Sequence, residues 1–186
     1  MSVTASNLIQ GPGTLYQGLF GAAEPADTAI NSSPAASAWT DVGATQDGVT
    51  VEIDITYSEL TCDQLIDTPE RRITKRETTL TTNLAEPTLA HLATVMNTAA
   101  PTTGASADFL EPVADLTATQ PVYSALIFDG FAPGGFRRRV AARKVLQTDK
   151  IQIAYKLADQ TVLSAQFTTH WVSSSIRPIR YADGKS

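Results

Sequence analysis

Residues 48–97 decide the fold of this chain, and they read GVTVEIDITYSELTCDQLIDTPERRITKRETTLTTNLAEPTLAHLATVMN. The first part alternates between aliphatic and polar side chains: Val49, Thr50, Val51, Glu52, Ile53, Asp54, Ile55 and Thr56. This period of two predicts a strand with one buried and one solvated face. After an acidic loop, residues 71–83 are rich in threonine and charge, which predicts a second extended segment with few aliphatic side chains of its own.

A short helix is predicted over residues 86–97. Pro87 suits the first helical turn, where its missing N–H is not needed. Apolar side chains then recur at helical spacing, at Leu89, Leu92, Ala93 and Met96. Asn97 and the following TAAPTTGAS are typical of a helix end.

A long strand pair with an acidic loop, followed at once by a helix that opens Glu-Pro-Thr-Leu, resembles the major tail tube proteins of long-tailed bacteriophages. The resemblance covers the order of elements between Trp39 and Ile179, and no catalytic motif contributes to it. It implies a mainly β, tail-tube-like sandwich or barrel of about six or seven strands with one flanking helix, a long N-terminal arm and long loops. The implied role is structural: stacked hexameric rings form a tube whose channel conducts viral DNA into the host.

The same resemblance implies the partners and the location of the chain. The partners are other copies of the chain, the tape measure protein and viral DNA in the channel, and the tail terminator and distal tail proteins. The protein would lie in the tail of the virion, after assembly in the host bacterial cytoplasm. The resemblance implies no cofactor, and no apolar run reaches the length of about 18 residues that spans a bilayer.

About one domain is expected from 186 residues with 42% hydrophobic content. The stretch 1–47 is rich in glycine, alanine, proline and serine, so we expect an arm that becomes ordered on assembly. The tube domain is predicted over 48–176, and a peripheral C-terminal tail over 177–186. Further strands are predicted in the second half, over 122–129, 137–147, 151–157 and 162–172.

Charge is distributed unevenly along the chain. Residues 1–70 hold ten acidic residues and no lysine or arginine, whereas residues 71–186 hold all fourteen basic residues and nine acidic ones. This asymmetry suits copies that meet head to tail or side by side, although one domain could also mix both halves on its surface. The net charge of −5 disfavours tight binding to nucleic acid. Candidates for intersubunit contacts are Asp63, Asp67, Glu70, Arg71, Arg72, Arg137, Arg139 and Arg143.

The polar faces of the two strands are the candidate lining of the channel. Acidic and hydroxyl side chains would let DNA slide, whereas many lysine or arginine contacts would hold its phosphates. If Arg76 pairs with Glu52 or Asp54, the wall stays near neutral. The candidates are Glu52, Asp54, Thr56, Thr74, Arg76 and Thr78.

The sequence predicts no enzyme and no catalytic, cofactor or metal site. Glu52 and Asp54 lie about 7 Å apart on one strand face, but that face is predicted to be solvated. Cys62 is the only cysteine, and His91 and His170 have no ligand-type residues at metal-binding spacing. No phosphate-binding glycine loop or hydrolase motif is present.

Three other functions remain open. A secretion-tube ring protein and a tail terminator or neck protein would share the fold. A monomeric β-sandwich binding module would need an exposed aromatic platform. Its members would be Trp39, Trp171, Tyr123 and Tyr155, but Trp171 is predicted to lie in the core, on one face with Phe167 and Leu163.

Overall fold

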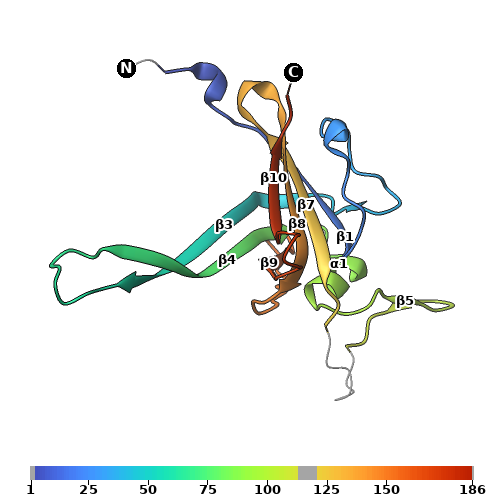
Figure 1. Ribbon diagram of the computed structural model, residues 1–186. Coiled ribbons are helices and arrows are strands. Elements are labelled where there is room, and N and C mark those ends of the chain that lie inside the picture. The colour runs from blue at the N-terminus through green and yellow to red at the C-terminus, as the bar shows by residue number, and fades with distance from the viewer. Residues whose placement is uncertain (1–2, 113–120, 186) are drawn as a thin grey trace.

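The computed structural model describes residues 3–112 and 121–185 (Figure 1). The prediction of a mainly β fold with one helix is confirmed. Eight strands form one antiparallel sheet in the spatial order β2-β1-β7-β8-β9-β4-β3, and β10 pairs with β8. They are β1 (Thr14–Leu19), β2 (Thr40–Asp41), β3 (Thr45–Leu60), β4 (Glu70–Leu84), β7 (Ser124–Phe131), β8 (Arg137–Gln147), β9 (Leu163–Thr169) and β10 (Ile179–Asp183).

Short elements connect and extend the sheet. Strands β5 (Thr102–Thr103) and β6 (Asp108–Phe109) form a separate small hairpin. The 3₁₀ turns are η1 (Ala5–Asn7), η2 (Asp27–Ala29) and η3 (Pro133–Gly135), and η3 lies in the connection between β7 and β8. Between the helix and β7, residues 113–120 lie outside the described part of the chain.

The sheet has an apolar core on each face. The larger cluster includes Leu15, Leu80, Leu126, Val145 and Leu163, together with Val95 of the helix. The smaller cluster lies on the opposite face, because successive side chains of a strand point to opposite sides. It contains Trp39, Ala125, Ile127 and Ala141. Residues 20–39, which we call the strap, cross this second face.

Helix α1 (Leu89–Val95) is shorter than predicted. Thr88 is its N-cap, and the hydroxyl of Thr88 accepts a hydrogen bond from the backbone N–H of His91 at 3.2 Å. Pro87 therefore precedes the helix instead of occupying its first turn. The helix ends before Asn97, whose positive φ of 54° leaves the helical conformation. The Asn97 side chain bonds both the N–H and the C=O of Gln147, which fixes this end of the helix to β8.

The segments predicted to be an N-terminal arm and a C-terminal tail both contribute strands to the sheet. Strand β1 lies between β2 and β7, with Leu15 only 2% exposed, so residues 14–47 are not an arm separate from the fold. At the other end, β10 pairs with residues 138–142 of β8, so the predicted peripheral tail also joins the sheet. These strands bring the sheet to eight members, more than the six or seven expected.

Two predictions for the C-terminal half are wrong. Residues 151–157 form no strand: only Ile153 makes a bridge, to Leu163, and Tyr155 and Leu157 are fully or almost fully exposed. The alternation of side chains predicts a strand here, but a strand also needs a neighbouring strand to pair with, and residues 151–157 make only the one bridge. Trp171 is 71% exposed because β9 ends at Thr169, before the alternation reaches it. With Trp39 buried and Trp171 exposed, the aromatic set proposed for a binding module does not form one exposed platform.

Candidate assembly surface

The β3–β4 hairpin projects from the body of the sheet (Figure 1). The two strands pair along their whole length, from Thr45 opposite Leu84 to Leu60 opposite Glu70. Only residues 79–84 of β4 also pair with β9, so the outer part of the hairpin is a two-stranded ribbon. Strand β3 is the edge of the sheet, and within the described residues its outer edge has no partner over 16 residues.

One face of this ribbon carries several exposed apolar side chains. Directly opposed residues share a face, and the register places Ile53 opposite Thr78, Ile55 opposite Arg76 and Tyr57 opposite Ile73. Ile53, Tyr57 and Ile73 are 45%, 53% and 56% exposed. We call Ile53, Ile55, Tyr57 and Ile73 the hairpin stripe. The stripe continues the apolar face of Val49 and Val51, which packs against the larger core cluster.

The opposite face of the ribbon is charged, and its acidic residues outnumber the single lysine. The register places Glu52 opposite Thr79, Asp54 opposite Glu77 and Thr56 opposite Lys75, and we call these six residues the hairpin polar face. The Lys75 ammonium lies 2.5 Å from a Glu77 carboxylate oxygen. The pKa of Lys75 is raised because its ammonium donates this hydrogen bond, with the charges of Glu77 and Asp54 adding to the effect.

The predicted channel lining is divided between these two faces. Glu52, Asp54 and Thr56 share one face, but Arg76 and Thr78 lie on the other, opposite Ile55 and Ile53, and Thr78 is only 3% exposed. Thr74 occupies a bulge, where its hydroxyl donates a hydrogen bond to the Thr56 carbonyl. Arg76 therefore does not share a face with Glu52 and Asp54, so the condition of a pair between them is not met, and Lys75 is the basic residue of the polar face.

The loop at the end of the hairpin, residues 61–69, carries two further predicted contact residues. Asp63 and Asp67 are exposed and form no ion pair within the described part of the chain. The other candidates on the hairpin pair locally: Arg71 with Glu59 at 2.5 Å and, more loosely, Arg72 with Glu70 at 3.9 Å. Such exposed pairs contribute little to stability.

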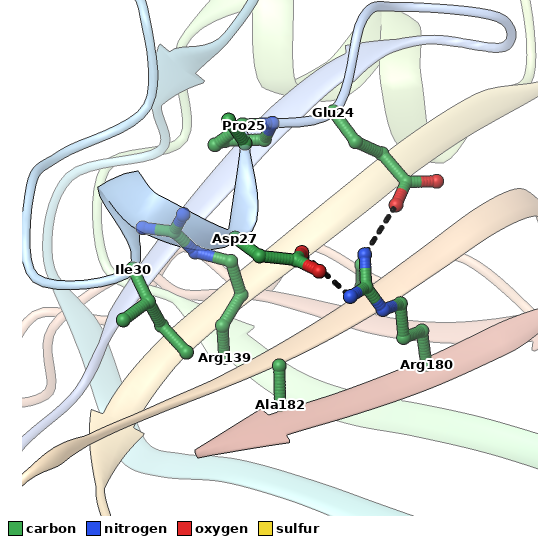
Figure 2. A pocket seen from close by; sticks show the side chains of 9 residues that line it. Glu24, Pro25, Asp27, Ile30, Arg139, Arg180 and Ala182 are labelled. Atoms are coloured by element: carbon green, nitrogen blue, oxygen red, sulfur yellow. Dashed lines mark hydrogen bonds and ion pairs between the residues drawn. The ribbon is translucent and has the colours of Figure 1, made fainter. Parts of the chain in front are cut away.

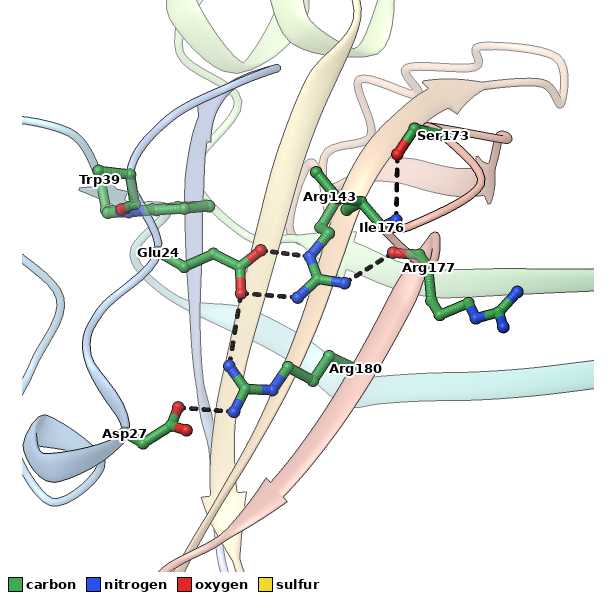
Figure 3. Close-up of polar contacts among 9 residues, drawn as sticks. Glu24, Asp27, Trp39, Arg143, Ser173, Ile176, Arg177 and Arg180 are labelled. Atoms are coloured by element: carbon green, nitrogen blue, oxygen red, sulfur yellow. Dashed lines mark hydrogen bonds and ion pairs between the residues drawn. The ribbon is translucent and has the colours of Figure 1, made fainter.

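The predicted contact arginines of β8 are satisfied within the chain. Arg139 forms a bidentate pair with Asp129, with both N···O distances 2.7 Å, and Arg137 approaches the same carboxylate at 3.4 Å. Arg143 forms a bidentate pair with Glu24 of the strap (Figure 3). Arg139 and Arg143 thus have acidic partners within their own chain, and their role as intersubunit contacts stays a prediction. The acidic first third of the sequence does supply a partner for Arg143, which is Glu24 of the same chain.

These arginines fasten the strap to the sheet. Arg180 reaches Asp27 at 2.6 Å and Glu24 at 3.8 Å, and Arg139 lies beside it under the η2 turn (Figure 2). Arg139 also donates to the Ser32 carbonyl at 2.8 Å. The pKa of Arg143 is raised by its hydrogen bonds to Glu24 against the opposing effect of burial. Glu24 therefore joins two arginines and anchors the strap over the smaller core cluster.

We expect Glu24→Gln to loosen the strap. The side chain of Glu24 is 28% exposed, so the loss of its charge should lower the free energy of unfolding by roughly 1–2 kcal/mol, below the full value of a buried pair. Asp27→Asn is the matched control, because Asp27 contacts the same Arg180 but is 74% exposed. Urea unfolding of both variants measures the difference, and equal losses would argue against Glu24 as the anchor.

The sequence matches no protein-family model, and the search of curated proteins finds no relative. One solved structure of similar arrangement is a chain of the anti-feeding prophage baseplate, determined by cryo-electron microscopy with six-fold symmetry imposed. The two chains are 10% identical, the alignment covers 98% of this chain and 95% of that one, and the TM-score is 0.45.

Among the described residues, no helix is long and apolar enough to cross a membrane. The same residues contain no group of three or more histidine, cysteine or acidic side chains placed to hold a metal ion. Cys62 is exposed in the loop of the hairpin.

Proposed function

We propose that this chain is a structural subunit of a phage tail tube. Copies join through the β3–β4 hairpin into hexameric rings, and the rings stack around a channel that conducts viral DNA. The observation that carries the proposal is the hairpin itself: a 16-residue edge strand in a ribbon with exposed apolar side chains on one face and mainly charged side chains on the other.

Such a ribbon needs a partner. A two-stranded hairpin is marginally stable in water unless further strands or a packed face support it. A long edge strand with free N–H and C=O groups is a template for another chain, and exposed apolar stripes mark interaction sites. If β3 pairs with the sheet of a neighbouring copy, its free N–H and C=O groups gain hydrogen-bond partners and the hairpin stripe is covered. A contact between two different surfaces of identical subunits closes into a ring when the rotation permits.

The hairpin polar face supports the assignment of a channel. In a closed sheet one face packs on protein and the other faces the lumen. With the stripe against protein, Glu52, Asp54, Thr56, Lys75, Glu77 and Thr79 face the channel. Three acids and one lysine repel phosphates more than they bind them, so DNA slides instead of being held. The tape measure protein would fill the same channel before DNA, with terminator and distal tail proteins at its ends.

A charge reversal in the lumen tests the lining. We expect particles with Glu52→Lys and Asp54→Lys to assemble but to release their genome slowly or incompletely, since the added ammonium groups bind passing phosphates. Asp108→Lys, on the exposed β6 strand, is the matched control and should leave release unchanged. Genome release triggered in vitro and followed by a DNA-binding dye gives the rate. Normal release from the double variant would refute the lining.

Negative-stain electron microscopy of the purified protein at rising concentration and salt tests the function itself. Rings or hollow tubes with a central hole are expected. A protein that stays monomeric under all conditions would contradict the proposal and favour a binding module or a terminator that requires another protein.

A further inference from the structure

An apolar pocket of about 310 Å³ opens between the strap, strands β7 and β8, and the turn that follows β9. Its walls include Phe20, Ala22, Ala125, Ala142, Val172 and Ile176. Phe20 and Ile176 are each 45% exposed, and the neighbouring Trp171 is 71% exposed. An apolar cavity of about 150 Å³ already accommodates benzene, so this pocket has room for two aliphatic side chains.

Two basic residues, Lys144 and Arg177, neighbour residues that line this pocket. The Lys144 ammonium lies 5.3 Å from the centre of the Phe20 ring and 4.3 Å from that of Tyr123. Arg177 follows Ile176, and its guanidinium points away from Glu24 (Figure 3) and has no acidic partner among residues 3–112 and 121–185. Glu24 also lines the pocket, but Arg143 and Arg180 engage its carboxylate. A ligand for this site would therefore be apolar and flanked by negative charge.

The end of the β3–β4 hairpin has this composition. Leu65 and Ile66 stand at its tip, 59% and 106% exposed, and Asp63 and Asp67 flank them in the sequence Asp-Gln-Leu-Ile-Asp. The whole Ile66 side chain is thus available to a partner, and together with Leu65 it forms an exposed apolar pair of the kind that marks interaction sites. The hairpin points away from the sheet body, so the tip does not reach the pocket of its own chain (Figure 1).

We propose that the pocket receives Leu65 and Ile66 from the hairpin of a second copy, with Asp63 and Asp67 facing Lys144 and Arg177. The inference rests on the proposed function and specifies one contact within it. Each copy offers one tip and one pocket, so the contact is head to tail and continues from copy to copy. The apolar insertion supplies burial, and the opposite charges select the orientation.

The native Cys62, three residues before Leu65, provides the test. Ser175→Cys places a second thiol beside Ile176, and copper–phenanthroline oxidation in air should join Cys62 of one copy to residue 175 of the next. The matched control is Ser106→Cys, in the exposed turn between β5 and β6. We expect at least ten-fold more disulfide-linked dimers and multimers from Ser175→Cys than from the control or from the unmodified chain with Cys62 alone.

Two further variants make the test specific. Ile66→Ser in the Ser175→Cys background should reduce cross-linking to the control level, and Ile66 is fully exposed, so the monomer fold is not at risk. Asp67→Lys and Arg177→Asp should each reduce cross-linking at least five-fold, and together they should restore it. Cross-linking that survives Ile66→Ser would overturn the inference.

The outcome is separable from that of the proposed function. Tubes that form without the Cys62–residue 175 cross-link would overturn the pocket assignment and leave the tube assignment intact. A protein that neither cross-links nor leaves the monomeric state would overturn both.

Discussion

Asp129→Ala should lower the free energy of unfolding by about 3–5 kcal/mol, because it leaves the charge of Arg139 buried without its counter-ion. Arg139 is 5% exposed and Asp129 is 6% exposed, and the two lie directly opposite each other on strands β8 and β7. Arg139 would keep its bonds to the Ser32 carbonyl and, at 3.5 Å, the Ala29 carbonyl, but two neutral acceptors do not compensate a desolvated guanidinium. A loss of this size is a large part of the stability of a domain.

The chain contains a control for this prediction. Arg138 and Asp183 form a bidentate pair with the same two N···O distances of 2.7 Å, but their side chains are 39% and 44% exposed. Solvent screens this pair, so Asp183→Ala should cost about 1 kcal/mol or less. Urea unfolding at neutral pH compares the two variants directly. Equal losses would mean that burial does not decide the strength of these pairs.

The pH dependence of the exposed pair has a defined sign. The hydrogen bond from Arg138 holds the pKa of Asp183 below its usual range, and the positive charge adds to this effect. Because the pKa is lowered in the folded state, the contribution is present above the pKa of the unfolded carboxyl. It is lost as the pH falls through the pKa of the folded state. Asp183→Asn should therefore remove a small part of the stability at neutral pH and nothing at strongly acidic pH.

The sequence predicted correctly those strands whose own residues show a clear alternation or composition. The alternation from Val49 to Ile55 predicted β3, and the bounds of β8, residues 137–147, were predicted to the residue. Strands β1 and β10 were missed because their segments look like an arm and a tail. Leu15 is buried because β1 pairs with β7, which lies more than a hundred residues later in the sequence. The pattern of residues 14–19 does not reveal β7 as the partner strand.

The faces of the hairpin could be predicted only in part. Glu52, Asp54 and Thr56 share a face by simple alternation on one strand. Which residues of β4 join them depends on register, and the bulge at Thr74 shifts the outer part of that register by one residue. The sequence also could not tell that Arg139 and Arg143 meet Asp129 and Glu24 of the same chain, since pairing of charges is a property of the tertiary fold.

Tyr57→Asp combined with Ile73→Asp should abolish assembly and leave a folded monomer. The two side chains face each other on the hairpin stripe and are each more than half exposed, so the monomer loses little packing. In the proposed assembly both are buried against a neighbouring copy. A buried apolar anchor contributes about 2 kcal/mol or more to an interface, which corresponds to a contact roughly thirty-fold weaker for each substitution. Repeated at every contact of a ring, this loss prevents closure.

Thr56→Asp is the matched control for this prediction. Thr56 lies on the same ribbon but on the polar face, opposite Lys75, where a further carboxylate meets a lysine instead of a protein surface. We expect rings and tubes from Thr56→Asp and only monomers from the stripe variant, by analytical ultracentrifugation and electron microscopy, with circular dichroism unchanged in both. The reverse result, tubes from the stripe variant and monomers from Thr56→Asp, would mean that the charged face packs between copies and the apolar face does not. A channel lined by Glu52 and Asp54 would then be untenable, because the two faces of one ribbon cannot both point into the lumen.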